Sequence, residues 1–259
     1  MAIHRVIGPP GTGKTTFGLG VVERLLGQGL APREILYSSF TRAAAYEAAG
    51  RAVRKFVEYT SSDFPYFRTC HSIARRLLNV PPSLLFTEKQ LAEFASTCGY
   101  ELSPQERQVS GEDIEIREMV LEKYADYFEF FINWWKNLNL PFEEAYSRFE
   151  KDMVYLPVEF SEETLSCYME RRERFIREKG LFGDFCDLLL QVLRQGVFPD
   201  VKTMIIDEAQ DNSPLMAKVF QHWAEVADDV YWIGDSDQCL FSWQGADPSL
   251  FLSIGVDED

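Results

Sequence analysis

The stretch Gly8-Pro9-Pro10-Gly11-Thr12-Gly13-Lys14-Thr15 decides the fold of this chain. It satisfies the pattern GxxxxGK[ST] at every fixed position. An apolar run at residues 3–7 precedes it, and a helical stretch at residues 14–26, closed by glycines, follows it. A strand that runs through a glycine-rich turn into a helix is the context in which this pattern forms a phosphate-binding loop.

The chemistry of such a loop follows from its backbone. Glycines let successive N–H groups turn inward, and the start of the helix adds positive potential. We expect Lys14 to reach the β and γ phosphates of a nucleoside triphosphate, and the Thr15 hydroxyl to coordinate Mg²⁺. The predicted nucleotide-binding residues are Gly8, Pro9, Pro10, Gly11, Thr12, Gly13, Lys14, Thr15 and Thr16.

A second candidate site is the string Asp207-Glu208-Ala209-Gln210-Asp211, which follows the apolar residues 204–206. Ligands of open α/β sheets bind at the carboxyl ends of the strands, where these acids are expected. Asp207 is predicted to hold the magnesium ion, and Glu208 to act as general base on the attacking water. An ordinary acidic turn is the alternative, and the phosphate loop on the same predicted sheet favours the catalytic interpretation.

The order of predicted elements indicates an α/β fold. Strands are expected at residues 34–39 and 66–69, with helices at 42–56 and 71–78, which makes a mostly parallel, doubly wound sheet with helices on both faces. Residues 81–196 predict helices only, and strands return at 201–206 and 230–233. We therefore predict a discontinuous sheet domain, residues 1–80 and 197–259, and an inserted all-helical subdomain at residues 81–196.

Within the insertion, helices are predicted at residues 88–98 and 113–137, and Ser161 is expected to cap another. Aromatic residues between 124 and 135 recur at spacings of three and four, which indicates a buried helix face more than a base-stacking platform. The basic cluster Arg171, Arg172, Arg174 and Arg177 is a candidate DNA contact, although a solvated helix face is the favoured interpretation.

The charge distribution is uneven. The net charge is −15, yet residues 1–80 carry a balance of +6 and the remainder −21. A basic first third allows polyanion binding on one face, while simple surface solvation remains the alternative. The five cysteines form no CxxC pair, which argues against a disulfide framework or a zinc site. With no apolar run of about 18 residues and no leader, the sequence predicts a soluble, cytoplasmic protein without membrane contact.

Further motifs resemble those of superfamily 1 DNA helicases of the UvrD, Rep and PcrA type. They follow the family's order and add to the phosphate loop and the acidic string. The matching stretches are Tyr37-Ser38-Ser39-Phe40-Thr41-Arg42-Ala43-Ala44-Ala45, Thr69-Cys70-His71-Ser72, Gly183-Asp184-Phe185-Cys186-Asp187-Leu188-Leu189, Gly234-Asp235-Ser236-Asp237-Gln238 and Trp243-Gln244-Gly245-Ala246.

The resemblance implies a RecA-like fold, the cofactors ATP and Mg²⁺, and roles for single residues. Lys14, Glu208 and Gln238 would be catalytic, with Gln238 contacting the γ-phosphate. Phe40 and Trp243 would stack on bases of single-stranded DNA, each stack worth about 1–3 kcal/mol. The residues implied to meet the DNA backbone are Thr41, Arg42, Thr69 and His71. Core packing of the aromatic rings, and a helix start at His71, are the alternatives.

Three features depart from the family pattern. No glutamine segment precedes the loop, and Gln244 stands where the family commonly has arginine. The third is that these 259 residues are expected to hold only one RecA-like domain, so the family's second domain, whose arginine can accelerate phosphoryl transfer by about 10³–10⁵, would act in cis or in trans.

The predicted partners are that second domain and single-stranded DNA or a junction of single and double strands. The favoured function is the motor of an ATP-dependent DNA helicase. A nucleotide-gated DNA-binding module, or a helicase/nuclease-complex subunit without unwinding activity of its own, is the alternative. A small-molecule kinase is disfavoured, because the strings at 207–211 and 234–238 have no role in one.

Overall fold

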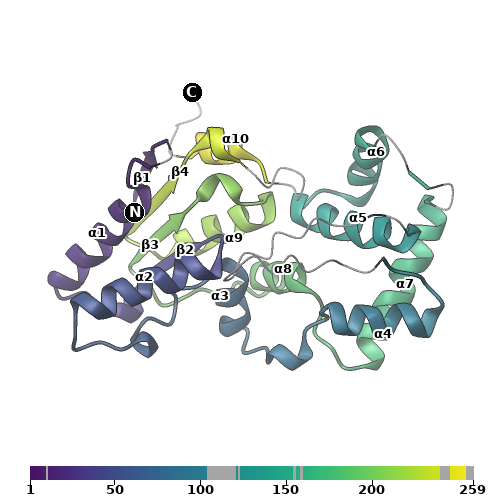
Figure 1. The fold of residues 1–259 in the computed structure, drawn as a ribbon, viewed down its shortest axis with the longest axis horizontal. Helices are drawn as coiled ribbons and strands as arrows, with labels where there is room; N and C mark the ends of the chain where they lie inside the picture. Colours follow the sequence, from purple (N-terminus) through teal and green to yellow (C-terminus); the bar gives the residue numbers. More distant parts are fainter. Residues whose placement is uncertain are drawn as a thin grey trace.

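The computed structural model describes residues 1–9, 11–103, 121, 123–153, 156–157, 160–239 and 246–254. Its centre is a sheet of four parallel strands in the order β1 (Ala2–Ile7), β4 (Asp229–Gly234), β3 (Thr203–Asp207) and β2 (Ile35–Ser39). Two of the neighbouring pairs, β1 with β4 and β2 with β3, join strands from distant parts of the sequence, and β3 and β4 are joined by a crossover through α9 (Pro214–Ala224), as parallel strands require. The predicted α/β class with a parallel sheet is therefore confirmed (Figure 1).

Helices cover both faces of the sheet, and side-chain alternation along the strands explains how. On one face, Leu36, Met204 and Trp232 pack in a core with α3 (Cys70–Leu77), α8 (Phe185–Gln195) and α9 (Pro214–Ala224). On the other face, Tyr37, Ile205 and Ile233 pack with α1 (Lys14–Gly27) and α2 (Arg42–Lys55). Because successive residues of a strand point to opposite faces, strands buried on both faces read as continuous apolar runs.

The predicted strand at residues 66–69 is wrong. Phe67 makes only an isolated parallel bridge to Tyr37. Its ring and that of Phe64 are both buried in the same core, with ring centroids 4.7 Å apart. A spacing of three places two side chains on opposite faces of a strand, so the segment turns instead of extending.

The insertion contains α4 (Glu88–Cys98), α5 (Tyr124–Leu138), α6 (Phe142–Asp152) and α7 (Glu162–Glu178), and lies beside the sheet in Figure 1. Its core is aromatic, with Phe128 and Phe131 fully buried on α5. The predicted buried face is therefore confirmed. The helix predicted at 113–137 begins instead at Tyr124, since Leu121 and Lys123 are not helical, while residues 113–120 lie outside the described residues. Ser161 caps α7 as predicted.

One arginine of the predicted solvated cluster is buried. Arg171, Arg174 and Arg177 are exposed, but Arg172 is only 4% exposed and lies over the Phe86 ring. Its guanidinium donates to Glu129 at 2.9 Å and to Asp184 at 3.0 Å. The expectation of a wholly solvated face was wrong, because a buried guanidinium is tolerated where carboxylates from other helices pair with it.

This ion-pair network joins the insertion to α8. Lys136 donates to Asp184 and Asp187, each at 2.7 Å, and Asp184 caps the start of α8. Burial alone would raise the pKa of Asp184, but Lys136 and Arg172 outweigh it and hold that pKa below its ordinary value. Three helices, α5, α7 and α8, are thereby fixed relative to one another.

The predicted domain boundaries remain a proposal, with one adjustment. Helix α8 falls within the predicted insertion, yet Cys186, Leu189 and Val192 pack in the core formed with Met204 and Ile206 of the sheet. We propose that the sheet domain includes α8. The remaining helices are α10 (Pro248–Ser253) and short 3-10 turns at Pro32–Glu34, Ser61–Asp63, Pro82–Leu84, Ala209–Asp211 and Ser236–Gln238.

Candidate nucleotide site and DNA-facing segments

The segments of the predicted nucleotide site all lie at one edge of the sheet, where three of its strands end. The phosphate loop follows β1, the acidic string follows β3, and Asp235 to Gln238 follow β4, which lies between the other two. Ile7 is paired in register with Gly234, and the Gly8 N–H donates to the Gly234 carbonyl at 3.2 Å. The carboxyl edge of a parallel sheet is where open α/β folds bind ligands.

The phosphate loop has the backbone that its glycines predict. Gly13 adopts φ +88° directly before α1, a conformation that residues with a Cβ rarely adopt. At Gly8 the constraint is space, because a Cβ would lie 2.6 Å from the Thr12 hydroxyl oxygen. Thr12 closes the turn by donating to the Pro9 carbonyl at 2.7 Å. Pro10 lies outside the described residues, and Thr16 is exposed in the first turn of α1.

The Lys14 ammonium lies over this loop. It donates to the Gly8 carbonyl at 2.7 Å and reaches the Pro9 carbonyl at 3.5 Å. These neutral carbonyl acceptors are weaker partners for an ammonium than phosphate oxygens. The loop therefore holds a cation that can exchange its backbone contacts for a polyphosphate.

Asp207 is the buried carboxylate of the site, with 2% of its surface exposed. Its Oδ2 accepts a hydrogen bond from the Tyr37 hydroxyl at 2.7 Å, and the Thr15 side chain also hydrogen-bonds to it. Burial raises the pKa of Asp207, and the nearby Glu208 adds to the rise, while the hydroxyl partners oppose it. The metal ligands predicted from sequence, Thr15 and Asp207, are thus in direct contact.

The residues present fit a magnesium ion. A hydroxyl and a carboxylate are oxygen ligands of the kind that Mg²⁺ prefers. Ser39, paired in register with Asp207, has a buried hydroxyl without a hydrogen-bond partner among the described residues. Water bound to a hydrated cation is the kind of partner that such a group lacks.

Glu208 is held in an unusual conformation. Its φ is +56°, in the left-handed region that costs a non-glycine residue about 1–3 kcal/mol and is enriched at active sites. The Gln210 side-chain amide donates to Glu208 Oε2 at 2.8 Å, and its Oε1 accepts from the Asp235 N–H at 2.9 Å. Gln210 therefore connects the candidate base to the turn that follows β4.

Gln238 lies in that turn and donates its side-chain amide to Asp235. This hydrogen bond is the main reason why the pKa of Asp235 is lowered, and the charge of Lys14 contributes. The turn carrying Gln238 thus lies within electrostatic range of the phosphate-loop lysine. The described structure brings all three predicted catalytic residues, Lys14, Glu208 and Gln238, to the same edge.

Three of the predicted DNA contacts, Phe40, Thr41 and Arg42, directly follow the carboxyl end of β2. Phe40 is partly buried and packs against the core that includes α3, α8 and α9. This position agrees in part with the alternative that its ring is a core aromatic. The Thr41 hydroxyl caps α2 by accepting from the Ala44 N–H at 3.3 Å, and Arg42 is exposed in the first turn. Thr69 precedes α3 and makes no side-chain cap. These roles remain predictions.

His71 packs edge-on against Phe185, with ring centroids 6.0 Å apart. Burial lowers the pKa of His71 to about 4, against the opposing influence of Asp184. Its imidazole is therefore neutral at neutral pH, and a DNA contact from it would be a hydrogen bond and not an ion pair. Trp243 and Gln244 lie outside the described residues.

Two site residues were missed from sequence. Tyr37 was quoted only as part of a motif, and its contact with Asp207 depends on β2 lying beside β3. Gln210 offered a weak signal, because a fully buried amide inside an acidic string must bond to several polar groups. Both residues orient acids that the sequence did identify.

This edge has the layout of a RecA-like, P-loop nucleotide-binding domain: a glycine-rich loop after one strand and acids after another. The family comparison agrees with that class. The model of the UvrD/REP helicase N-terminal domain matches residues 3–258, so the chain belongs to this family of DNA helicases.

Curated relatives carry the corresponding names. The chain is 24% identical to a probable DNA helicase of Mycoplasma pneumoniae, covering 96% of this chain and 46% of the relative. It is 25% identical to the putative ATP-dependent DNA helicase YjcD of Bacillus subtilis, over 97% and 32%. It is 23% identical to the ATP-dependent DNA helicase Rep of Buchnera aphidicola, over 97% and 38%. The chain thus spans less than half the length of these relatives.

Within the described part of the chain, no helix combines the length and the apolar character needed to cross a membrane.

Proposed function

We propose that this chain is the ATP-binding and DNA-binding motor domain of an ATP-dependent superfamily 1 DNA helicase. The observation that carries the proposal is the convergence of Lys14, Thr15, Asp207, Glu208 and Gln238 on one carboxyl edge. Family membership supports it, since the matched family is one of DNA helicases. Translocation on single-stranded DNA and duplex unwinding belong to the proposal.

Each residue has a proposed part in binding and hydrolysis. Lys14 would leave the carbonyls of the loop and bind the β and γ phosphates, while Thr15 and Asp207 hold Mg²⁺. Bound ATP with Mg²⁺ supplies the phosphoanhydride whose hydrolysis releases free energy. Glu208, oriented by Gln210, would accept the proton of the attacking water.

Gln238 is proposed to report the state of the γ-phosphate. It is joined through Asp235 to Gln210, and Gln210 is joined to Glu208. A change at the γ-phosphate that Gln238 senses would therefore pass from the turn after β4 through three hydrogen bonds to Glu208. That turn leads to the predicted base-stacking residue Trp243.

The opposite wall of the site is proposed to come from a second RecA-like domain, in cis or in trans. An arginine from that wall would stabilise the charge that develops in the transition state. Without it, we expect nucleotide binding with slow hydrolysis. DNA-stimulated hydrolysis with the second domain present supports the motor, whereas persistent inactivity supports the nucleotide-gated binding module.

The direct test of DNA binding is fluorescence anisotropy with a labelled oligothymidine. The titration is carried out at low salt, with and without a non-hydrolysable ATP analogue and Mg²⁺. We expect saturable DNA binding whose affinity changes when nucleotide is present, because the proposed DNA contacts after β2 lie at the same edge of the sheet as the candidate nucleotide site. No binding of single-stranded DNA under either condition would overturn the proposed function.

A further inference from the structure

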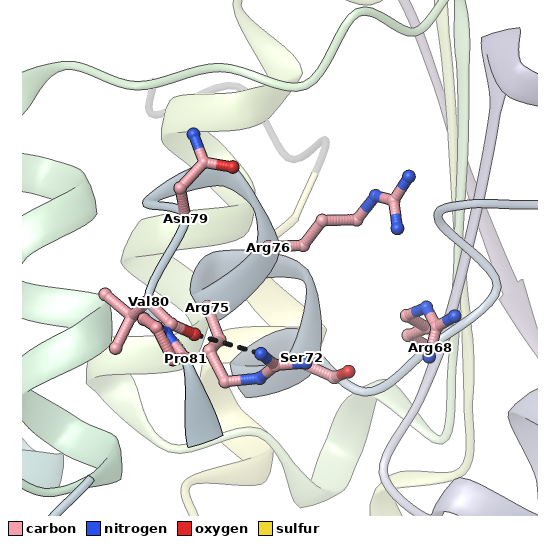
Figure 2. A pocket seen from close by; sticks show the side chains of 7 residues that line it. All are labelled: Arg68, Ser72, Arg75, Arg76, Asn79, Val80 and Pro81. Atoms are coloured by element: carbon pink, nitrogen blue, oxygen red, sulfur yellow. Dashed lines mark hydrogen bonds between the residues drawn. The ribbon is translucent and has the colours of Figure 1, made fainter. Parts of the chain in front are cut away.

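A polar cavity of about 310 Å³ lies beside the carboxyl-terminal half of α3. Its lining includes Arg68, Ser72, Arg75, Arg76 and Asn79 (Figure 2). None of these residues belongs to the nucleotide site described above, and no acidic residue lines the cavity. Three guanidinium groups thus border one small cavity in a chain of net charge −15.

Two other cations of the sheet domain have carboxylate partners that the three arginines of the cavity lack among the described residues. Arg51 is paired with Glu47 and Lys55 with Glu23, each at 2.5 Å. Among the described residues, no carboxylate forms an ion pair with any of the three arginines of the cavity. Their positive charge is therefore available to an anion.

Two of the guanidinium groups are fixed by backbone carbonyls. Arg75 donates to the Val80 carbonyl at 3.0 Å, the contact drawn in Figure 2. Arg68 donates from Nε to the Pro65 carbonyl at 3.2 Å, which leaves its terminal nitrogens free of any described bond. In Figure 2, Arg76 extends away from α3 toward the side on which Arg68 lies. Fixed donors cost less entropy when they bind a ligand.

Helix stabilisation explains only part of this arrangement. Arg75 and Arg76 lie in the last turn of α3, where cations interact favourably with the helix dipole. Arg68, however, precedes the start of α3 at Cys70, so the dipole gives no reason for its position. Residues from both ends of the helix therefore border one cavity, where they can reach a shared ligand.

We propose that this cavity binds a backbone phosphate of the single-stranded nucleic acid. Arg68 and Arg76 would donate to its oxygens, and Ser72 would add a hydroxyl donor. Arg68 directly precedes Thr69, which is a predicted contact to the DNA backbone. The single-stranded nucleic acid would therefore continue from Thr69 along α3 toward the insertion. This inference rests on the proposed function, because it assigns a further contact to the same nucleic-acid strand.

The test is the salt dependence of oligothymidine binding by the full 259-residue chain. Each phosphate contact on a single strand contributes about 0.7 to the slope of log affinity against log salt. For R68Q/R76Q we expect a slope shallower by about 0.7 and an affinity about fivefold lower at 0.1 M salt. Arg33 is exposed and lies in the turn directly before the amino end of β2, away from the sheet edge that carries the candidate site. It supplies the control R33Q, which should change neither the slope nor the affinity.

Several results overturn the proposal, and each is distinct. An unchanged slope in R68Q/R76Q, with wild-type binding intact, refutes the cavity while leaving the proposed function standing. The same unchanged slope with a lowered thermal midpoint assigns the arginines to helix stability only. If inorganic phosphate stabilises the wild type and not the variant, yet the slope is unchanged, the cavity takes a free anion.

A lack of DNA binding by the wild type refutes the proposed function itself. Affinity for a fluorescent ATP analogue should stay the same in R68Q/R76Q, which shows that the variant is folded.

Discussion

Replacing Tyr37 with phenylalanine removes a single hydroxyl from the most buried part of the candidate site. Tyr37 is fully buried, and burial and the adjacent Asp207 raise the pKa of its hydroxyl, so it remains a protonated donor. Its hydrogen bond to Asp207 is 2.7 Å long. A hydrogen bond to a charged group contributes about 1.5–3 kcal/mol, and for a chain of this size its loss lowers the thermal midpoint by about 3–6 °C.

The effect should depend on pH in a defined direction. Burial raises the pKa of Asp207 in the folded state, so ionisation of this group costs stability once the pH exceeds the unfolded value of about 4. Tyr37 opposes that rise, and Y37F would increase it. The difference between Y37F and wild type should therefore be largest at pH 7–8 and shrink as the pH falls toward 4.

Differential scanning calorimetry across this pH range measures the effect. Tyr59 provides the control Y59F, because its hydroxyl has no hydrogen-bond partner among the described residues, and this variant should match the wild type. A midpoint difference for Y37F that is constant with pH, or equal to that of Y59F, would refute the reasoning. Asp207 would then not depend on Tyr37 for its charge.

Three further changes test separate parts of the structure. R172A should destabilise the fold by about 3–5 kcal/mol, because it leaves Asp184 buried without one of its partners; denaturant unfolding measures this, with the exposed R174A expected near zero. E208Q should keep nucleotide affinity and lose residual hydrolysis, measured as phosphate release, and normal turnover would exclude Glu208 as the base. W243A should weaken single-strand affinity by about 1–3 kcal/mol without changing the salt slope, because it removes stacking and no charge.

The residues that meet at the candidate nucleotide site could largely be identified from sequence, because the signals that mark them are local. The phosphate loop requires glycines within a few residues of one lysine, and the acidic string follows one apolar strand. Strands at 34–39, 201–206 and 230–233 were located within two residues of β2, β3 and β4, since buried parallel strands leave continuous apolar runs.

What sequence could not predict depends on contacts between distant segments. The strand expected at 66–69 failed because Phe64 and Phe67 share one core, which strand propensity does not report. Arg172 looks like its exposed neighbours in sequence, and only the approach of α5 and α8 gives it Glu129 and Asp184. The position of Tyr37 against Asp207 likewise depends on strand order.

The central claim is that the edge carrying Lys14, Asp207 and Glu208 is a nucleoside triphosphate site. A titration of the chain with a fluorescent ATP analogue, with and without Mg²⁺, tests it most directly when wild type and K14A are compared. We predict saturable binding by the wild type that strengthens with Mg²⁺, and no binding by a folded K14A. Equal affinity of the two proteins would contradict the claim.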